Sequence, residues 1–324
     1  MTNDTTLEEF EVKAKSWLDE NAQKKPAAFE KEAEWGEGEF SVAVFHNLTF
    51  EEESSLLQEA AEWQIAKSEE GYHAITWPIQ YGGLDLPIEY ARAFARLESD
   101  YITPSRHETF SVTTRLIAPT VLHYGTDDQK DELLSDLFSA KIYCCQLFSE
   151  PGTGSDLAGL GCKAEKDGDE WIINGQKVWS SGAQFSQWGE LIARSHQDQP
   201  KHKGMTAFMI PMDLPGIEIR QIRQMSGGTS FNEVFFSDVR IPDRLRLGPE
   251  GEGWGVALTT LSFERDHSDS DGGGRAGGKW SQLLGTAKSL GLLEDPQVRQ
   301  RLMEVYTQNQ IQRFVNRRAA DLRK

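Results

Sequence analysis

The chain has 324 residues, of which 34 are Lys or Arg and 51 are Asp or Glu, so its formal net charge at pH 7 is −17. This acidity excludes most nucleic-acid binders, because they need an electropositive face to replace the counterions of phosphates. Apolar residues make up 38% of the sequence, a share typical of a packed soluble protein. The length predicts about two or three domains.

The sequence shows no signal for a membrane or for a disulfide framework. It contains no apolar run of about 18 residues, and residues 1–10 have neither a basic nor an apolar signal region. Its three cysteines, Cys144, Cys145 and Cys162, are odd in number and lack the spacing of metal ligands. We therefore expect no membrane insertion, no metal site and a cytoplasmic location.

Residues 1–140 predict an N-terminal helical domain, because apolar residues recur there at helical spacing. A helix often begins at a Ser or Thr that is followed three residues later by Glu or Gln. Three such capping boxes are present: Thr6 with Glu9, Thr49 with Glu52, and Thr126 with Gln129. Between the second and third predicted helices, residues 76–83 contain Pro78, Gly82 and Gly83, which predict a loop.

Residues 141–250 predict a central β domain, because short β-rich runs follow one another without intervening helices. The predicted strands are 162–166, 171–173, 177–179, 190–193, 206–211, 217–222 and 232–241. Asp167-Gly168 and Asn174-Gly175 are read as the turns between the first three. This order predicts an antiparallel sandwich or barrel and excludes a dinucleotide-binding α/β unit.

Residues 251–324 predict a C-terminal helical domain, in which Asp295 and Pro296 begin a long helix as N-cap and first residue. The whole chain is therefore an α+β multidomain protein: an N-terminal helical domain, a central antiparallel β-barrel or sandwich, and a C-terminal helical domain.

Two segments carry candidate chemistry. Residues 148–156 are rich in Gly, Ser and Thr, which lets a backbone approach a ligand and supplies hydrogen-bond donors. Taken alone a loop of this kind is more often a plain turn, and it lacks the Lys and the spacing of a P-loop. Trp179, followed by Ser180 and Ser181, is either a sheet residue or a platform for a cofactor.

Together the two segments resemble the paired flavin-binding segments of acyl-CoA dehydrogenases. Leu147 to Asp156 and Asn174 to Gly182 stand in the same order and at a similar separation as in that family. The likeness extends over almost the whole chain, through segments at 77–83, 125–126, 239–242, 251–254 and 263–265. It agrees with the order of helical, β and helical domains.

The resemblance implies an FAD enzyme that oxidises the Cα–Cβ bond of an acyl-CoA thioester and passes electrons to an electron-transfer flavoprotein or another acceptor. By the same resemblance, Gln146, Phe148 and Ser149 would contact the flavin. Trp179 would stack on the isoalloxazine ring, Ser181 would hydrogen-bond near flavin N5, and Ser155 would contact CoA.

The resemblance also assigns the base that removes the α-proton. Members of the family place a glutamate either at the start of the first C-terminal helix or much nearer the C-terminus, and Glu264 fits the first position. Arg265 would then contact CoA. Burial against flavin would raise the pKa of Glu264 and suit it to this task. A Glu-Arg pair on a solvated surface is the plain alternative.

Two departures from the family leave alternatives open. The last part of the C-terminal domain is missing, so the chain is expected to be a fragment or to depend on a homo- or hetero-oligomeric partner. Residues 271–278 hold five glycines, which favour a loop or a closely packed helix. A non-catalytic subunit that binds acyl-CoA or FAD in a heteromeric dehydrogenase is the main alternative, and an oxidase or monooxygenase on this scaffold is a third.

Overall fold

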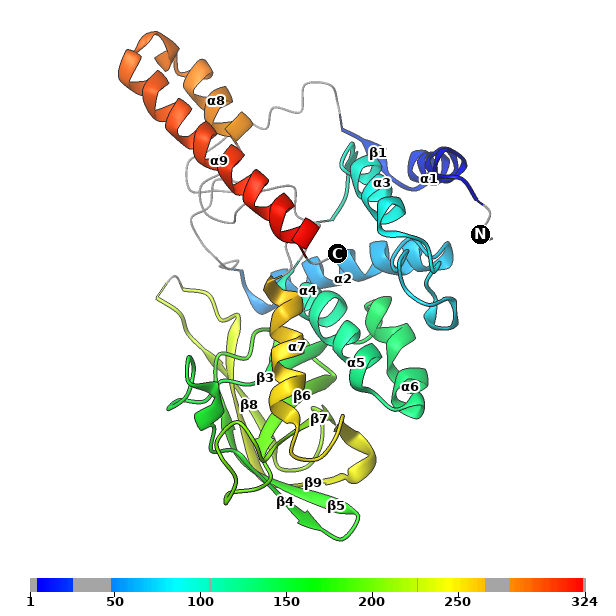
Figure 1. The fold of residues 1–324 in the computed structure, drawn as a ribbon, viewed down its shortest axis with the longest axis vertical. Helices are drawn as coiled ribbons and strands as arrows, with labels where there is room; N and C mark the ends of the chain where they lie inside the picture. Colours follow the sequence, from blue (N-terminus) through cyan, green and yellow to red (C-terminus); the bar gives the residue numbers. More distant parts are fainter. Residues whose placement is uncertain (1–4, 26–47, 105–106, 226, 266–279, 323–324) are drawn as a thin grey trace. The chain divides into compact units, whose positions relative to one another are not determined.

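The computed structural model describes residues 5–25, 48–104, 107–225, 227–265 and 280–322. These residues form two compact units, one that ends at Arg265 and one that contains the residues from 280 onward. The first unit has a layer of helices and one large sheet, and the second is a pair of helices (Figure 1).

All but one of the α-helices described for the first unit precede the large sheet in the chain, and one follows it. They are α1 (Leu7–Asn21), α2 (Phe50–Glu69), α3 (Ile88–Glu98), α4 (Glu108–Ser111), a π-helical segment (Val112–Ile117), α5 (Ala118–Tyr124), α6 (Asp127–Phe138) and α7 (Gly253–Arg265). All three predicted capping boxes are confirmed, at the starts of α1, α2 and α6. The predicted loop at 76–83 contains a single 3-10 turn, Ile79–Tyr81.

The large sheet has eight strands in the order β10-β7-β6-β4-β5-β9-β8, with β3 beside β6. They are β3 (Cys144–Leu147), β4 (Lys163–Asp167), β5 (Glu170–Lys177), β6 (Trp188–Arg194), β7 (Met205–Pro211), β8 (Ile217–Ile222), β9 (Phe231–Pro242) and β10 (Arg246–Leu247). Most pairs are antiparallel, but β3 and β4 each run parallel to β6. A further two-residue pair joins β1 (Gln23–Lys24) to β2 (Tyr101–Ile102).

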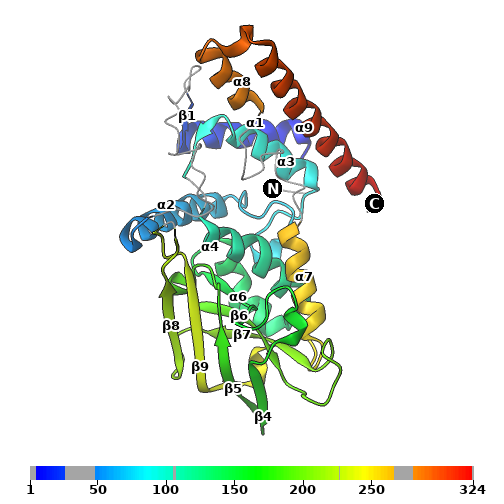
Figure 2. The same ribbon diagram turned by 90° about the vertical axis from the view of Figure 1, so that its left-hand side faces the viewer.

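The sheet folds into two layers, so it is sandwich-like and not a closed barrel. Alternate residues of its central strands point to opposite faces: Ile192 and Met209 pack against the helices, whereas Leu191 and Phe208 pack against the outer strands β4, β5 and β9. Figure 2 shows those outer strands and β8 side by side, below α4 and beside α7. The strands β6 and β7 are consequently covered on both faces.

The predicted turn at Asn174-Gly175 is wrong. The strand β5 continues through both residues, with a shift of register against β9 between Ile173 and Gly175. Gly175 has a φ of 145°, and a Cβ there would lie 2.8 Å from the Cα of Cys162. The residues therefore form a bulge that bends one strand. The Asp167-Gly168 turn is confirmed, because β4 and β5 pair as a hairpin on either side of it.

The second unit consists of α8 (Trp280–Ser289) and α9 (Pro296–Leu322), which lie side by side. Asp295 caps α9 as predicted, since its Oδ1 accepts a hydrogen bond of 2.8 Å from Gln297 N. The glycine-rich run 271–278 lies outside the described residues. The division into domains at residues 140 and 250 stays a prediction.

Candidate functional site

The two segments singled out in the sequence meet where β3 and β5 end. Val178 N donates a hydrogen bond of 2.9 Å to Ser149 O, and Lys177 Nζ donates one of 3.0 Å to Phe148 O. The Gly/Ser/Thr loop after β3 and the Trp179 segment after β5 are therefore held next to each other, although about 30 residues separate them along the chain.

Trp179 is held in an unusual position. Its φ is 61°, a left-handed backbone that a large side chain adopts at a cost of about 1–3 kcal/mol. Its side chain is 57% exposed and meets the ring of Phe231 edge to face, with 5.7 Å between the ring centres. The hydrogen bond from Ser180 N to Asn232 O, 3.1 Å long, fixes the next residue. An aromatic face is thus offered outward by a strained and well-anchored backbone.

Three buried polar atoms of β3, of the Trp179 segment and of α4 have no hydrogen-bond partner among the described residues. They are, in that order, Gln146 Nε2, Ser180 Oγ and Thr109 Oγ1. Thr109 lies directly over Gly182, because a Cβ at that glycine would stand 1.7 Å from Thr109 Oγ1. Each unpaired buried group costs about 1–3 kcal/mol. A ligand that combines an aromatic ring with polar edges would satisfy them, so these residues fit a flavin.

A buried ion pair that the sequence analysis missed braces the two segments. Lys177 is 0% exposed, and its Nζ lies 2.8 Å from Glu150 Oε1. Glu150 also accepts hydrogen bonds from Gly161 N, at 2.7 Å, and from Cys162 N, at 2.9 Å. One carboxylate therefore closes the loop 150–162, and one ammonium ties that loop to β5. The available signal was the position of both charged residues inside the two motifs.

Of the remaining predicted residues, Ser181 is partly buried, and Ser155, Glu264 and Arg265 are solvent-exposed. Ser155 lies in the loop before the 3-10 turn Leu157–Gly159. Glu264 and Arg265 lie in the last described turn of α7, so Glu264 is not at the start of a helix as expected. The side chain of Glu264 is exposed, and its expected burial against flavin stays a prediction. The assignments of these three residues stay predictions.

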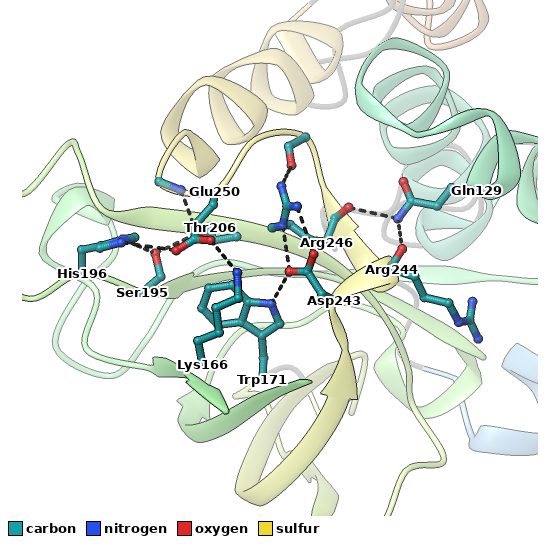
Figure 3. A network of polar contacts seen from close by, with 12 residues as sticks. Gln129, Lys166, Trp171, Ser195, His196, Thr206, Asp243, Arg244, Arg246 and Glu250 are labelled. Carbon is teal, nitrogen blue, oxygen red and sulfur yellow. Dashed lines mark hydrogen bonds and ion pairs between the residues drawn. The ribbon is translucent and has the colours of Figure 1, made fainter. Parts of the chain in front are cut away.

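A polar network holds the connection from β9 to α7 (Figure 3). Asp243 accepts hydrogen bonds from Trp171 Nε1, at 2.7 Å, and from Arg246 Nε, at 3.0 Å. The hydrogen bonds from Arg246, followed by that from Trp171, lower the pKa of Asp243 to about 2 against the opposing effect of burial. Further along, Gly251 N donates to Thr206 Oγ1 at 3.0 Å. The helix α7 therefore begins at a fixed place on β7.

The described residues contain no group of three or more His, Cys, Asp or Glu side chains placed to hold a metal ion. All three cysteines are free and buried. Within the same residues, no helix combines the length and the apolar character needed to cross a bilayer.

Sequence profiles of two domains match this chain: the acyl-CoA dehydrogenase N-terminal domain over residues 39–141 and the acyl-CoA dehydrogenase middle domain over residues 145–239. The acyl-CoA dehydrogenase IpdE1 of Mycolicibacterium smegmatis is 36% identical over 265 residues, which cover 79% of this chain and 67% of that protein. The IpdE1 of Mycobacterium tuberculosis is 34% identical over 301 residues, 93% of this chain and 74% of that protein. The chain belongs to the acyl-CoA dehydrogenase family.

Solved structures agree with this assignment. A structure described as the Tcur3481-Tcur3483 steroid ACAD G363A variant has a TM-score of 0.73 and 26% identity, and the match covers 96% of this chain and 75% of that one. The ChsE4-ChsE5 complex from Mycobacterium tuberculosis shares the fold, with a TM-score of 0.68 at 22% identity over 99% of this chain and 78% of that one. The resemblance and the fold class predicted from the sequence are thus confirmed.

Proposed function

We propose that the chain is a subunit of an FAD-dependent dehydrogenase that introduces a Cα–Cβ double bond into an acyl-CoA thioester. The observation that carries this proposal is the meeting of the two family segments through Val178 N and Ser149 O, with Trp179 facing outward beside them. The unpaired Gln146 Nε2 and Ser180 Oγ support it, because a flavin offers the polar edges that they lack.

In this proposal each side chain has a simple task. FAD, when bound, supplies the acceptor for the hydride that leaves Cβ. Trp179 stacks on the flavin ring, Gln146, Phe148, Ser149 and Ser181 orient it, and Ser155 and Arg265 hold the CoA part of the substrate. Glu264 takes the α-proton. A carboxylate positioned as a general base accelerates such a reaction by about a hundred- to ten-thousand-fold. An electron-transfer flavoprotein or another acceptor then reoxidises the protein.

The descriptions of similar structures support a proposal for the substrate and the assembly. A neighbour at 26% identity is described as a steroid ACAD of two named chains, so we propose a steroid-derived acyl group and a partner of the same family.

The test is anaerobic stopped-flow reduction of the FAD-loaded protein, purified with any co-expressed partner, by steroid-derived and straight-chain acyl-CoAs. Glu264→Gln keeps the size of the side chain but not its basicity, so substrate binding should persist while flavin reduction slows at least a hundredfold. Glu252→Gln, an exposed glutamate just before α7, is the matched control and should reduce at the parental rate. If flavin in Glu264→Gln were reduced at the parental rate, the base would be another residue or would lie in another chain. That result would favour the non-catalytic alternative.

A further inference from the structure

Glu190 is a carboxyl group at the centre of the protein core. It lies in the middle of β6, is 0% exposed, and belongs to a strand whose other central residues are also buried. Its Oε1 lies 2.7 Å from Thr260 Oγ1 on α7. Its Oε2 has no hydrogen-bond partner among the described residues. A lone carboxyl in such a place must contribute something that an apolar side chain would not.

Burial without a cationic partner in the described part of the chain favours the neutral carboxyl of Glu190. Thr260 Oγ1 lies 3.2 Å from Val256 O and 3.0 Å from Thr120 Oγ1, and the Thr120 hydroxyl donates to Leu116 O at 2.8 Å. The Thr260 hydroxyl can donate to Glu190 Oε1 in either state, and a neutral Glu190 can also donate to Thr260, whose own proton then goes to Val256 O. Among the described residues, Glu190 Oε2 has no donor in either state, which costs more free energy when the carboxylate is charged. Burial raises the pKa of Glu190 to about 8, against the effect of Thr260.

Glu190 also stands between the two halves of the proposed site. In the parallel pair of β3 and β6 it is in register with Gln146, so both side chains lie on the same face of the sheet. On α7, Thr260 precedes Glu264 by four residues, which places both on one face of the helix. One hydrogen bond therefore joins the strand next to Gln146 to the helix that carries Glu264.

We propose that Glu190 is a positioning residue, which sets α7 on the sheet through Thr260 and thereby aims Glu264 at the substrate. This inference rests on the proposed function for its last step, but the coupling of Glu190 to α7 does not. In the neutral state the carboxyl and Thr260 lock helix to sheet. When the carboxyl ionises, the hydrogen bond from Thr260 persists, but the charge is buried without a counterion from the described chain. Separation of α7 from the sheet, which lets water reach the carboxylate, therefore becomes less costly.

The surroundings of Glu190 leave ionisation uncompensated. Among the described residues, the titratable group on β3 that interacts with it is the Cys144 thiol, whose own pKa is raised well above its usual range, chiefly by burial. From α7 the neutral Thr260 contacts Glu190, and Thr120 of α5 contacts Thr260. No Lys or Arg of the described chain forms an ion pair with Glu190. The open form, in which the carboxyl is hydrated, therefore gains population as the pH rises.

Amide hydrogen exchange of α7 tests the coupling, with protection expressed relative to the intrinsic rate at each pH. If opening exposes Glu190, linkage predicts that parental protection of residues 253–265 falls about tenfold between pH 7 and pH 9. Glu190→Gln keeps the shape of the side chain but cannot ionise, so its protection should change less than about twofold. In the FAD-loaded assembly, the limiting rate of flavin reduction should fall above pH 8 in the parent and not in Glu190→Gln, with acyl-CoA affinity unchanged.

Two buried threonines provide the matched control. Thr260→Val removes the partner of Glu190 and should lower the protection of α7 at pH 7. Thr120 contacts Thr260 and not Glu190, so Thr120→Val should leave the parental fall in protection between pH 7 and pH 9 unchanged. Equal pH dependence of protection in the parent and in Glu190→Gln would overturn the coupling. A difference in protection without a difference in the pH profile of flavin reduction would overturn the positioning role. Absence of flavin reduction in both proteins at every pH, with the difference in protection intact, would contradict the proposed function and uphold the coupling.

Discussion

Replacement of Lys177 by Met tests whether the buried ion pair holds the proposed flavin site together. The substitution keeps the length of the side chain but removes the ammonium group, so Glu150 retains only the hydrogen bonds from Gly161 N and Cys162 N. The carbonyl of Phe148 also loses its donor. Because Lys177 is fully buried and Glu150 only 11% exposed, breaking this pair should cost about 3–5 kcal/mol of the free energy of unfolding.

Lys201 offers the matched control, because it forms an ion pair of nearly the same length in the open. Its Nζ lies 2.7 Å from Asp156 Oδ1, but the two side chains are 54% and 64% exposed. An exposed pair of this kind contributes about 0–1 kcal/mol. Lys177→Met and Lys201→Met therefore remove the same group from two pairs that differ chiefly in burial.

Thermal unfolding at pH 7, followed by circular dichroism, distinguishes the two cases. For a chain of this size about 1 kcal/mol corresponds to about 2–4 °C in Tm, so Lys177→Met should lower Tm by about 6–20 °C and Lys201→Met by less than about 4 °C. Lys177→Met combined with Glu150→Gln should recover part of the loss, because no unpaired charge stays buried. Equal Tm values for the two single variants would refute the claim that this pair braces the loop.

Two further predictions concern Trp179 and Asp243. Trp179→Ala should lower FAD retention on gel filtration without lowering Tm, because the indole is mostly exposed. Trp179→Phe should retain more flavin than Trp179→Ala. Equal flavin content in the parent and both variants would contradict the stacking role. Hydrogen bonds from Arg246 lower the pKa of Asp243 to about 2. The ionised Asp243 therefore stabilises the folded protein above the usual carboxyl pKa, and this contribution is lost as the pH falls through 2. Asp243→Asn should therefore be less stable than the parent in urea at pH 6, with a difference that shrinks toward pH 2; a constant difference would rule out this assignment.

Local sequence signals predicted most of the fold because they depend on neighbouring residues. A capping box satisfies backbone donors within four residues, and the three such boxes begin helices as expected. The Asn174-Gly175 turn failed for the opposite reason. That dipeptide favours a hairpin locally, but the pairing of β5 with β9 on both sides of it and the close approach of Cys162 enforce a bulge. Long-range pairing thus outweighed local preference.

The site was predictable only where a motif carries it. Trp179 and Ser149 stand in recognisable segments, and the structure brings those segments together. The partners Lys177 and Glu150 lie in the same motifs, but burial and not residue type gives them their effect. Glu190 had a weaker signal, a single acid in an otherwise apolar run. Its meaning depends on Thr260, 70 residues later, and no local pattern reports such a contact.

The strand β6 explains how the two halves of the proposed site can keep a fixed geometry. On one side it pairs in register with β3, which ends at the Gly/Ser/Thr loop and at Gln146. On the other side it pairs with β7, against which α7 begins so closely that a Cβ at Gly253 would lie 2.7 Å from the backbone of Thr206. The strand β6, which is covered on both faces, thus connects the loop after β3 to the helix α7. Close-packed elements of this kind shift between discrete arrangements more readily than they deform. A change of charge at Glu190, in the middle of that strand, should therefore act on the position of the whole of α7 and not on one side chain.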